Sequence, residues 1–471
     1  MSAPAHPMPR TQADPFTWEA RSLRRYATCG PRDHSYPAAI SFNSSFSAID
    51  QQAALARSNA GGKPLSLYVH FPFCRWSCHY CAHHKIASQD RRVVEPYLSR
   101  LDREMVLTTQ HLDTQREIAQ LYWGGGTPSF LGLDQMSDLI DRLDARFGLS
   151  SARDRDYAIE IDPREADVLT LRHLQALGFN RLSLGVQDLD PKVQQAINRV
   201  QPLALTEVLI DEAGRLGFHS LNLDLIYGLP LQTRDTFAAT LEQVIAMAPA
   251  RLSIFDYTHM PERFAAQRHI HAEELPSPEE KLAILRTSIA MLTAAGYVHI
   301  GMDHFARHDD SLAIAQREGT LQRNCQGYSS HVHCDLVGLG VSAISCLDDV
   351  YSQNHTRLNA YENALDAGRL PVARGIRLTF DDRLRRHAIE RLMCDMALDL
   401  NELSETFGID APRYLADTLT RLEQPQRDGL VIIEAQRITV TPLGRLLLRQ
   451  LALAFNGRLP QPSGLPDSRI A

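Results

Sequence analysis

The sequence predicts an α/β fold: a partial (β/α)6 barrel with an N-terminal arm and a C-terminal, mainly helical, winged-helix-like domain. Two observations predict it. Short apolar runs alternate with helical segments between residues 61 and 301, which is typical of parallel βαβ units. After residue 370 amphipathic helices and one hairpin-like pair of strands replace this alternation. We expect an arm at 1–60, the barrel and its extension at 61–365, the C-terminal domain at 370–458 and a disordered tail at 459–471.

The barrel elements follow one another in order. Strands are expected at 65–70, 118–123, 157–161, 181–186, 220–227, 251–256 and 297–301. Helices are expected between them at 94–110, 135–147, 167–177, 191–197, 204–216, 236–247 and 278–295. Right-handed crossovers curl such a sheet into a full or partial barrel, so the carboxyl ends of the strands line one mouth. Polar side chains at those ends are candidates for a site.

The segments outside the barrel have different patterns. Residues 1–60 are polar and lack sustained periodicity, and the tail is rich in Pro, Gly and Ser. The C-terminal domain is expected to hold helices at 384–396, 401–407, 413–422 and 443–454, with a hairpin at 430–433 and 438–440. Acidic residues dilute the basic run of its first helix, which favours a lid over the barrel mouth rather than a DNA-binding surface.

Charge and hydropathy narrow the class of protein. The formal net charge of −7 argues against general nucleic-acid binding. No apolar run reaches the roughly 18 residues that a membrane span needs, and the first residues lack the apolar core of a signal peptide. We therefore expect a cytoplasmic protein, a monomer, without membrane insertion.

One loop concentrates the cysteines. Cys74, Cys78 and Cys81 follow the first predicted strand with the spacing Cys-x3-Cys-x2-Cys. Three thiolates in one loop can hold three corners of a [4Fe–4S] cluster and leave the fourth iron open. In radical S-adenosylmethionine (SAM) enzymes this open iron binds SAM, so the spacing predicts a radical SAM enzyme. A structural zinc site completed by His79, His83 or His84 is the alternative, but zinc modules usually pair two clips from separate turns.

A glycine run ends the second predicted strand, at residues 124–126, and Thr127 and Pro128 follow it. Glycines let the backbone approach a ligand closely. Because this strand neighbours the cysteine loop, the run is a candidate for binding the SAM amino group.

Beyond these motifs, the sequence resembles the oxygen-independent coproporphyrinogen III oxidases (coproporphyrinogen dehydrogenases) of the radical SAM superfamily. The likeness runs from about residue 35 to about residue 455, with matching stretches that include 65–74, 123–128, 159–165, 178–188 and 222–230. The resemblance implies a partial radical SAM barrel, a [4Fe–4S] cluster and two SAM molecules. It also implies oxidative decarboxylation of coproporphyrinogen III to protoporphyrinogen IX in haem and porphyrin biosynthesis. The tetrapyrrole substrate and an unidentified reductant and electron acceptor are the expected partners.

The resemblance also assigns individual positions. Those around the SAM bound to the cluster fall on Tyr68, Gly125, Glu160 and Ile344. Those around a second SAM fall on Tyr80, Gly126, Thr127, Gln187, Arg199, Asp224 and Thr258. Asp303 and His304 are catalytic candidates, since an Asp-His pair can orient substrate or move protons. His83, the third candidate, stands where the family usually has a fourth loop cysteine.

Two further functions stay open at this stage. The changes at His83 and Thr258 cluster where substrate is expected, which fits a diverged family member that acts on another substrate by methyl transfer or radical addition. A haem-binding carrier on the same scaffold could use the histidines His83, His84, His331 and His333. The intact SAM positions argue against a pure carrier.

Overall fold

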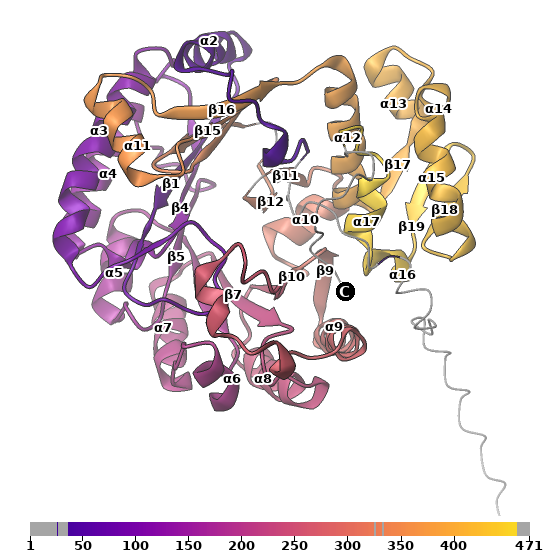
Figure 1. The fold of residues 1–471 in the computed structure, drawn as a ribbon, viewed down its shortest axis with the longest axis horizontal. Helices are drawn as coiled ribbons and strands as arrows, with labels where there is room; N and C mark the ends of the chain where they lie inside the picture. Colours follow the sequence, from indigo (N-terminus) through magenta and orange to yellow (C-terminus); the bar gives the residue numbers. More distant parts are fainter. Residues whose placement is uncertain (1–25, 27–35, 325, 332–333, 459–471) are drawn as a thin grey trace, which may run out of the picture.

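A computed structural model describes Tyr26 and residues 36–324, 326–331 and 334–458 (Figure 1). The expected tail, most of the arm before residue 36 and His333 lie outside the described residues. A 12-stranded sheet runs through the larger part of the fold in the order β16-β15-β14-β13-β1-β4-β5-β6-β7-β8-β10-β9. The division of the chain at 1–60, 61–365 and 370–458 stays a prediction.

Six neighbouring parallel strands form the partial barrel. They are β1 (Leu65–Phe71), β4 (Ile118–Gly125), β5 (Asp156–Ile161), β6 (Arg181–Gln187), β7 (Ser220–Tyr227) and β8 (Arg251–Asp256). The helices between and after them are α3 (Val94–Thr109), α4 (Leu133–Phe147), α5 (Val168–Ala176), α6 (Pro191–Ala196), α7 (Leu203–Leu216), α8 (Arg234–Ala246) and α9 (Pro278–Ala294). Helices cover the outside of the barrel. β1 buries six of its seven residues, whereas β5, β6 and β7 alternate buried with half-buried residues. The predicted (β/α)6 architecture is confirmed.

The seventh predicted strand differs in its pairing. β9 (Tyr297–Gly301) reverses into β10 (His304–Arg307), which lies between β8 and β9 and is antiparallel to both. Met302 makes the reversal possible with a φ of 50°. A methionine at this position gives no turn signal, so the sequence did not indicate the hairpin.

The other edge of the sheet is an extension that the sequence did not resolve into elements. β13 (Asp335–Leu339) pairs in parallel with β1, and β14 (Ile344–Leu347), β15 (Val350–Asn354) and β16 (Val372–Arg377) continue from it as an antiparallel meander. α10 (Ser311–Arg317), the hairpin of β11 (Gln322–Asn324) and β12 (Gly327–Ser329), and α11 (Leu358–Asp366) complete this part. Short strands with buried polar residues, such as Ser352 and Asn354, lack the apolar runs that identified the barrel strands.

Part of the expected arm belongs to the core. α2 (Ala48–Ser58) starts at a capping box between Ser47 and Asp50, and it buries Ala54 and Leu55 in the main apolar cluster. Most of the apolar residues of this helix are alanines, which give a weak periodic signal, so residues 36–60 read as an extension. Short 3-10 helices lie at Ala39–Ser41, Asn59–Gly61, Arg91–Val93, Pro128–Phe130, Ala265–His269 and Ala272–Glu274.

The C-terminal elements surround an apolar cluster of their own. They are α12 (Phe380–Asp395), α13 (Leu400–Phe407), α14 (Ala411–Tyr414), α15 (Ala416–Arg427), α16 (Pro442–Arg445) and α17 (Leu448–Leu453), with a three-stranded sheet β17-β19-β18. The expected hairpin is β18 (Val431–Glu434) and β19 (Arg437–Val440), and β17 (Ala397–Asp399) adds an unpredicted third strand. Figure 1 shows this winged-helix-like unit beside the barrel. Among the described residues, no helix combines the length and apolar character that a membrane crossing requires.

Candidate functional site

A cavity of about 1170 Å³ lies at the carboxyl ends of the barrel strands. Its walls are the cysteine loop, the ends of β4 to β8, and a segment of the C-terminal unit at residues 445–450. It exceeds the roughly 300–1,000 Å³ of a typical small-molecule pocket, so it has room for a cofactor and a large substrate together. The predicted site residues line this cavity with three exceptions, Tyr68, His304 and Ile344.

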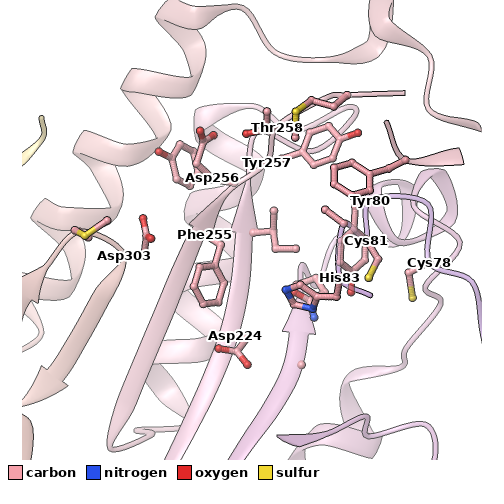
Figure 2. Close-up of a pocket in the computed structure, with 18 of the residues that line it drawn as sticks. Cys78, Tyr80, Cys81, His83, Asp224, Phe255, Asp256, Tyr257, Thr258 and Asp303 are labelled. Atoms are coloured by element: carbon pink, nitrogen blue, oxygen red, sulfur yellow. The ribbon is translucent and has the colours of Figure 1, made fainter. Parts of the chain in front are cut away.

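The cysteine loop is held against the barrel by backbone hydrogen bonds. β2 (Phe73–Cys74) pairs with β3 (Ile86–Ala87), and the His79 amide donates to the Ile197 carbonyl oxygen at 3.0 Å. Cys74, Cys78 and Cys81 are all free thiols, and all three line the cavity. Figure 2 shows Cys78 and Cys81 on one side of the cavity, next to His83. The loop thus presents its three thiols to one space.

Two arginines surround Cys78. Arg199 Nη1 and Arg164 Nη2 lie 3.6 and 3.5 Å from the Cys78 sulfur, and both guanidinium groups also pair with Asp162, at 2.9 and 2.7 Å. Burial alone would raise the pKa of Cys78, but these guanidinium groups outweigh it and lower the pKa below its ordinary value. Burial raises the pKa of Cys74 to about 11, so this thiol needs a bound metal cation to deprotonate it.

The arrangement suits an iron–sulfur cluster rather than a single ion. Among the described residues, no three of His, Cys, Asp and Glu are placed to hold one metal ion. A structural zinc ion needs four ligands around one centre, whereas a cluster binds each thiolate at a different iron. The three free thiols therefore fit a [4Fe–4S] cluster.

The glycine run lies where the backbone at the end of β4 packs closely against neighbouring residues. A Cβ at Gly126 would come within 2.7 Å of the Phe73 carbonyl oxygen, and Gly125 has a φ of 115° with the His70 ring against its Cα. The Gly125 amide donates to Glu160 Oε2 at 3.0 Å. The absence of side chains thus lets the end of β4 lie directly between the cysteine loop and Glu160.

Two buried carboxyl groups face the cavity from β5 and β7. Glu160 accepts a hydrogen bond from the Tyr122 hydroxyl at 2.9 Å, and burial raises its pKa to about 7. Asp224 accepts from Ser183 and Asn222, each at 2.8 Å, and burial also raises its pKa. A cationic ligand stabilises the ionised form of such carboxyl groups. SAM carries both an ammonium and a sulfonium charge, so these groups fit it.

Polar atoms without partners point to a ligand in the same space. Thr258 Oγ1 and Arg199 Nε are buried, and among the described residues neither has a hydrogen-bond partner. Gln187 ends β6 with a φ of 68° and lines the cavity with Tyr80 and Thr127. Buried polar groups are nearly always satisfied in native proteins, so these atoms are expected to bond to a bound molecule.

Three predicted site residues lie outside the cavity and pack against other parts of the fold. The Tyr68 hydroxyl lies 3.1 Å from His70 Nδ1, and its ring packs against Tyr122, the partner of Glu160. Ile344 packs in a small apolar cluster with Tyr351. His304 is enclosed by the rings of Phe255 and Tyr328, and burial lowers its pKa to about 3.

The other two catalytic candidates reach the cavity from different sides. Desolvation and the nearby Lys85 ammonium lower the pKa of His83, which keeps its imidazole neutral near pH 7. Asp303 lies in the turn between β9 and β10, 3.6 Å from Arg449 of the C-terminal unit. Figure 2 shows Asp303 and Cys78 on opposite sides of the cavity. The expected Asp-His pair is therefore split, with only Asp303 at the cavity.

Several cations of the cavity wall were not found by sequence reasoning. Lys281 on α9 pairs with Asp256 at 2.6 Å, and Arg374 on β16 donates to Gln353 at 2.8 Å. Arg445 and Arg449 come from the C-terminal unit. None of these belongs to a short motif, and only the fold brings them to the mouth.

Comparisons with known proteins agree with this geometry. The family model of the radical SAM superfamily matches residues 68–244, and that of the HemN C-terminal domain matches residues 378–447. The oxygen-independent coproporphyrinogen III oxidase of Pseudomonas aeruginosa is 48% identical over 97% of this chain and 99% of its own. The Escherichia coli protein of the same name is 44% identical over 96% of this chain and 98% of its own. A solved structure of coproporphyrinogen III oxidase from Escherichia coli, described as a radical SAM enzyme, superimposes with a TM-score of 0.89 over 95% of this chain and 100% of that chain, at 42% identity.

Proposed function

The chain belongs to the oxygen-independent coproporphyrinogen III oxidase family of radical SAM enzymes, and we propose that it converts coproporphyrinogen III to protoporphyrinogen IX. In this reaction two propionate side chains each lose a hydrogen atom, an electron and CO2 and become vinyl groups. The observation that carries the proposal is the match over nearly the whole chain, C-terminal unit included, to relatives of that name. The SAM-binding geometry adds the chemistry that the reaction needs.

The cofactors of the enzyme are a [4Fe–4S] cluster and SAM. Bound together, they supply a 5′-deoxyadenosyl radical that abstracts hydrogen from the substrate. We propose that Cys74, Cys78 and Cys81 ligate the cluster. Arg164 and Arg199 favour the thiolate of Cys78, and Gly125 and Glu160 hold the SAM amino group next to the cysteine loop.

A second SAM is proposed beside the first. Its site consists of residues that face the cavity from the cysteine loop and from β4 to β8: Tyr80, Gly126, Thr127, Gln187, Arg199, Asp224 and Thr258. The unpartnered Thr258 hydroxyl and Arg199 Nε support a ligand there. The Asp224 carboxylate would face the positively charged ammonium and sulfonium groups of this second SAM.

The catalytic candidates have distinct proposed roles. His83 stands next to the cysteine loop as a neutral imidazole, so it can accept or donate a hydrogen bond to substrate or SAM. Asp303 orients the guanidinium group of Arg449, which lies 3.6 Å away. His304 is a positioning residue, because its ring packs against Phe255 of the cavity wall.

The remaining proposals concern partners and location. We propose a cytoplasmic monomer that takes electrons from a separate one-electron reductant, passes the substrate electron to a separate acceptor, and binds no nucleic acid. The net charge of −7 supports the last point.

The decisive assay is anaerobic turnover. The reconstituted protein is mixed with SAM, a reductant and coproporphyrinogen III, and 5′-deoxyadenosine and the vinyl product are followed by mass spectrometry. Both products are expected. Deoxyadenosine without vinyl product would instead favour a diverged radical SAM reaction. His83, which replaces the usual fourth loop cysteine, would then be the first residue to examine.

A further inference from the structure

The wall of the cavity opposite the cysteine loop carries two arginines with no role in cofactor binding. We propose that Arg445 and Arg449 form a carboxylate-binding subsite that holds a propionate group of the tetrapyrrole substrate. This inference rests on the proposed function, since it names how the same cavity would hold that substrate. It assigns a substrate contact to the C-terminal unit.

Arg445 is a cation whose counter-ion is not found in the described part of the chain. It ends α16 and lines the cavity, and none of the described residues forms an ion pair or a side-chain hydrogen bond with it. Desolvation by the surrounding protein lowers its pKa. A half-buried guanidinium group with five unused donors is unfavourable unless an anion completes it.

Arg449 adds a second, partly engaged cation. Its guanidinium group lies 3.6 Å from Asp303, and both side chains are about one-sixth exposed. A contact of this length is too long for a hydrogen bond, so the donors of Arg449 are available to a ligand. Asp303 fixes the direction of the arginine without saturating it.

Other cations of the cavity wall make contacts of their own, among them Lys85 with the Cys78 carbonyl oxygen and Arg374 with Gln353. Arg164 and Arg199 share Asp162 beside Cys78. Lys281 pairs with Asp256 at 2.6 Å. The 445–449 segment differs in carrying two cavity-lining arginines whose guanidinium groups form no side-chain hydrogen bond within the described part of the chain.

The residues between the two arginines fit the rest of the substrate. Leu446, Leu447 and Leu448 also line the cavity, so the wall alternates from cation to apolar surface to cation. A porphyrinogen has an apolar ring system with carboxylates on its rim, which matches such a wall. The chemical class of the ligand is thus a large apolar ring with carboxylate arms.

The position of the subsite decides which propionates it can hold. Arg449 contacts Asp303, and Asp303 lies across the cavity from Cys78 (Figure 2). A propionate at the arginines therefore points away from the cysteine loop, where the radical is generated. The subsite would bind a propionate that the reaction keeps and leave the reacting ones toward the cofactors.

The test compares the binding of a porphyrin with four ionised carboxylates and of its uncharged methyl ester. Coproporphyrin III and its tetramethyl ester are titrated into the cluster-loaded enzyme under anaerobic conditions, and binding is followed by porphyrin fluorescence. The wild-type enzyme is expected to prefer the free acid. Arg445→Gln is expected to weaken free-acid binding by at least about tenfold, the effect of one charge-assisted hydrogen bond, and to leave ester binding unchanged.

Matched variants separate charge from packing. Arg445→Lys keeps the charge but loses the paired donors, so it is expected to recover part of the affinity. Arg427→Gln removes an exposed arginine of the same unit that pairs with Glu423, and it is expected to bind as the wild type does. In turnover, Arg445→Gln is expected to raise KM far more than it lowers kcat.

Three outcomes overturn the subsite: a wild-type enzyme that binds acid and ester equally, an Arg445→Gln variant with unchanged free-acid affinity, or equal losses for acid and ester. The wild-type comparison needs no variant, so misfolding of Arg445→Gln leaves the test intact. Failure of the proposed function has a different signature, because the wild-type enzyme then forms no vinyl product. Normal wild-type product with an unchanged KM in Arg445→Gln would refute the subsite alone.

Discussion

Glu104 is a buried acid whose removal should change how stability depends on pH. It lies on α3, 2% exposed, and accepts hydrogen bonds from the Gly340 amide at 2.7 Å and from Asn354 and Tyr361 at 2.6 Å. Burial, opposed by these three hydrogen bonds, raises its pKa from 4.5 to about 7. Glu104 thereby joins α3 to the loop that follows β13.

The raised pKa sets the sign and size of the effect. Folding favours the protonated form, so this stability is fully present below about pH 4.5 and is lost as the pH rises through about 7. The difference between the two pKa values corresponds to about 3 kcal/mol, of which about 2.5 kcal/mol falls between about pH 5 and about pH 8. Glu104→Gln is neutral at every pH, so the variant should lack this loss.

The assay is urea unfolding of both proteins across this pH range. Because other buried acids titrate in both proteins, the informative quantity is the wild-type free energy of unfolding minus that of the variant. It is expected to fall by about 2.5 kcal/mol from about pH 5 to about pH 8. Glu207→Gln, which removes an exposed carboxyl group on α7, controls for the loss of one charge. A difference that does not change with pH would refute the assignment of a raised pKa to Glu104.

Two further predictions concern the cofactor site. Cys81→Ser is expected to lose the cluster absorbance and most bound iron, whereas His83→Cys should keep full iron, since three thiols already suffice; equal iron content in both variants would contradict this ligand set. Glu160→Gln should retain the cluster but bind SAM at least about tenfold more weakly by calorimetry, because it loses the charge that faces the cationic ligand, and an unchanged affinity would remove Glu160 from the SAM site.

The barrel was predictable because its strands carry regular apolar patterns. β1 is an almost fully buried run, and β7 alternates buried with half-buried residues. The order of β1, β4 and β7 along the chain is also their order in the sheet. β10 and the meander from β13 to β16 were not predictable in the same way. Their burial depends on partners distant in sequence, such as the parallel pairing of β13 with β1, so polar residues are tolerated where periodicity would demand apolar ones.

The candidate site was likewise predictable only in part. Glu160 and Asp224 lie in the carboxyl-terminal halves of β5 and β7, Gln187 ends β6 and Thr258 follows β8, and parallel strands bring these positions to one mouth. Their grouping could therefore be inferred from the sequence. The support of Glu160 could not, since it comes from Tyr122 across the sheet. The sequence likewise does not show that His304 turns into the protein while its neighbour Asp303 turns into the cavity.

The cavity wall formed by residues 445–450 shows what the cysteine motif alone does not describe. The proposed cofactor site lies on the cysteine loop and the strand ends of the barrel, where Arg164 and Arg199 already pair with Asp162. The arginines proposed to bind the substrate carboxylates, Arg445 and Arg449, lie more than 180 residues after the last barrel strand β8. A surface arginine and a substrate arginine look alike in a sequence, because only the packed structure shows that Arg445 lines the cavity without a counter-ion among the described residues. The two proposals thus place radical generation and substrate recognition in different parts of the chain, whose residues line one cavity.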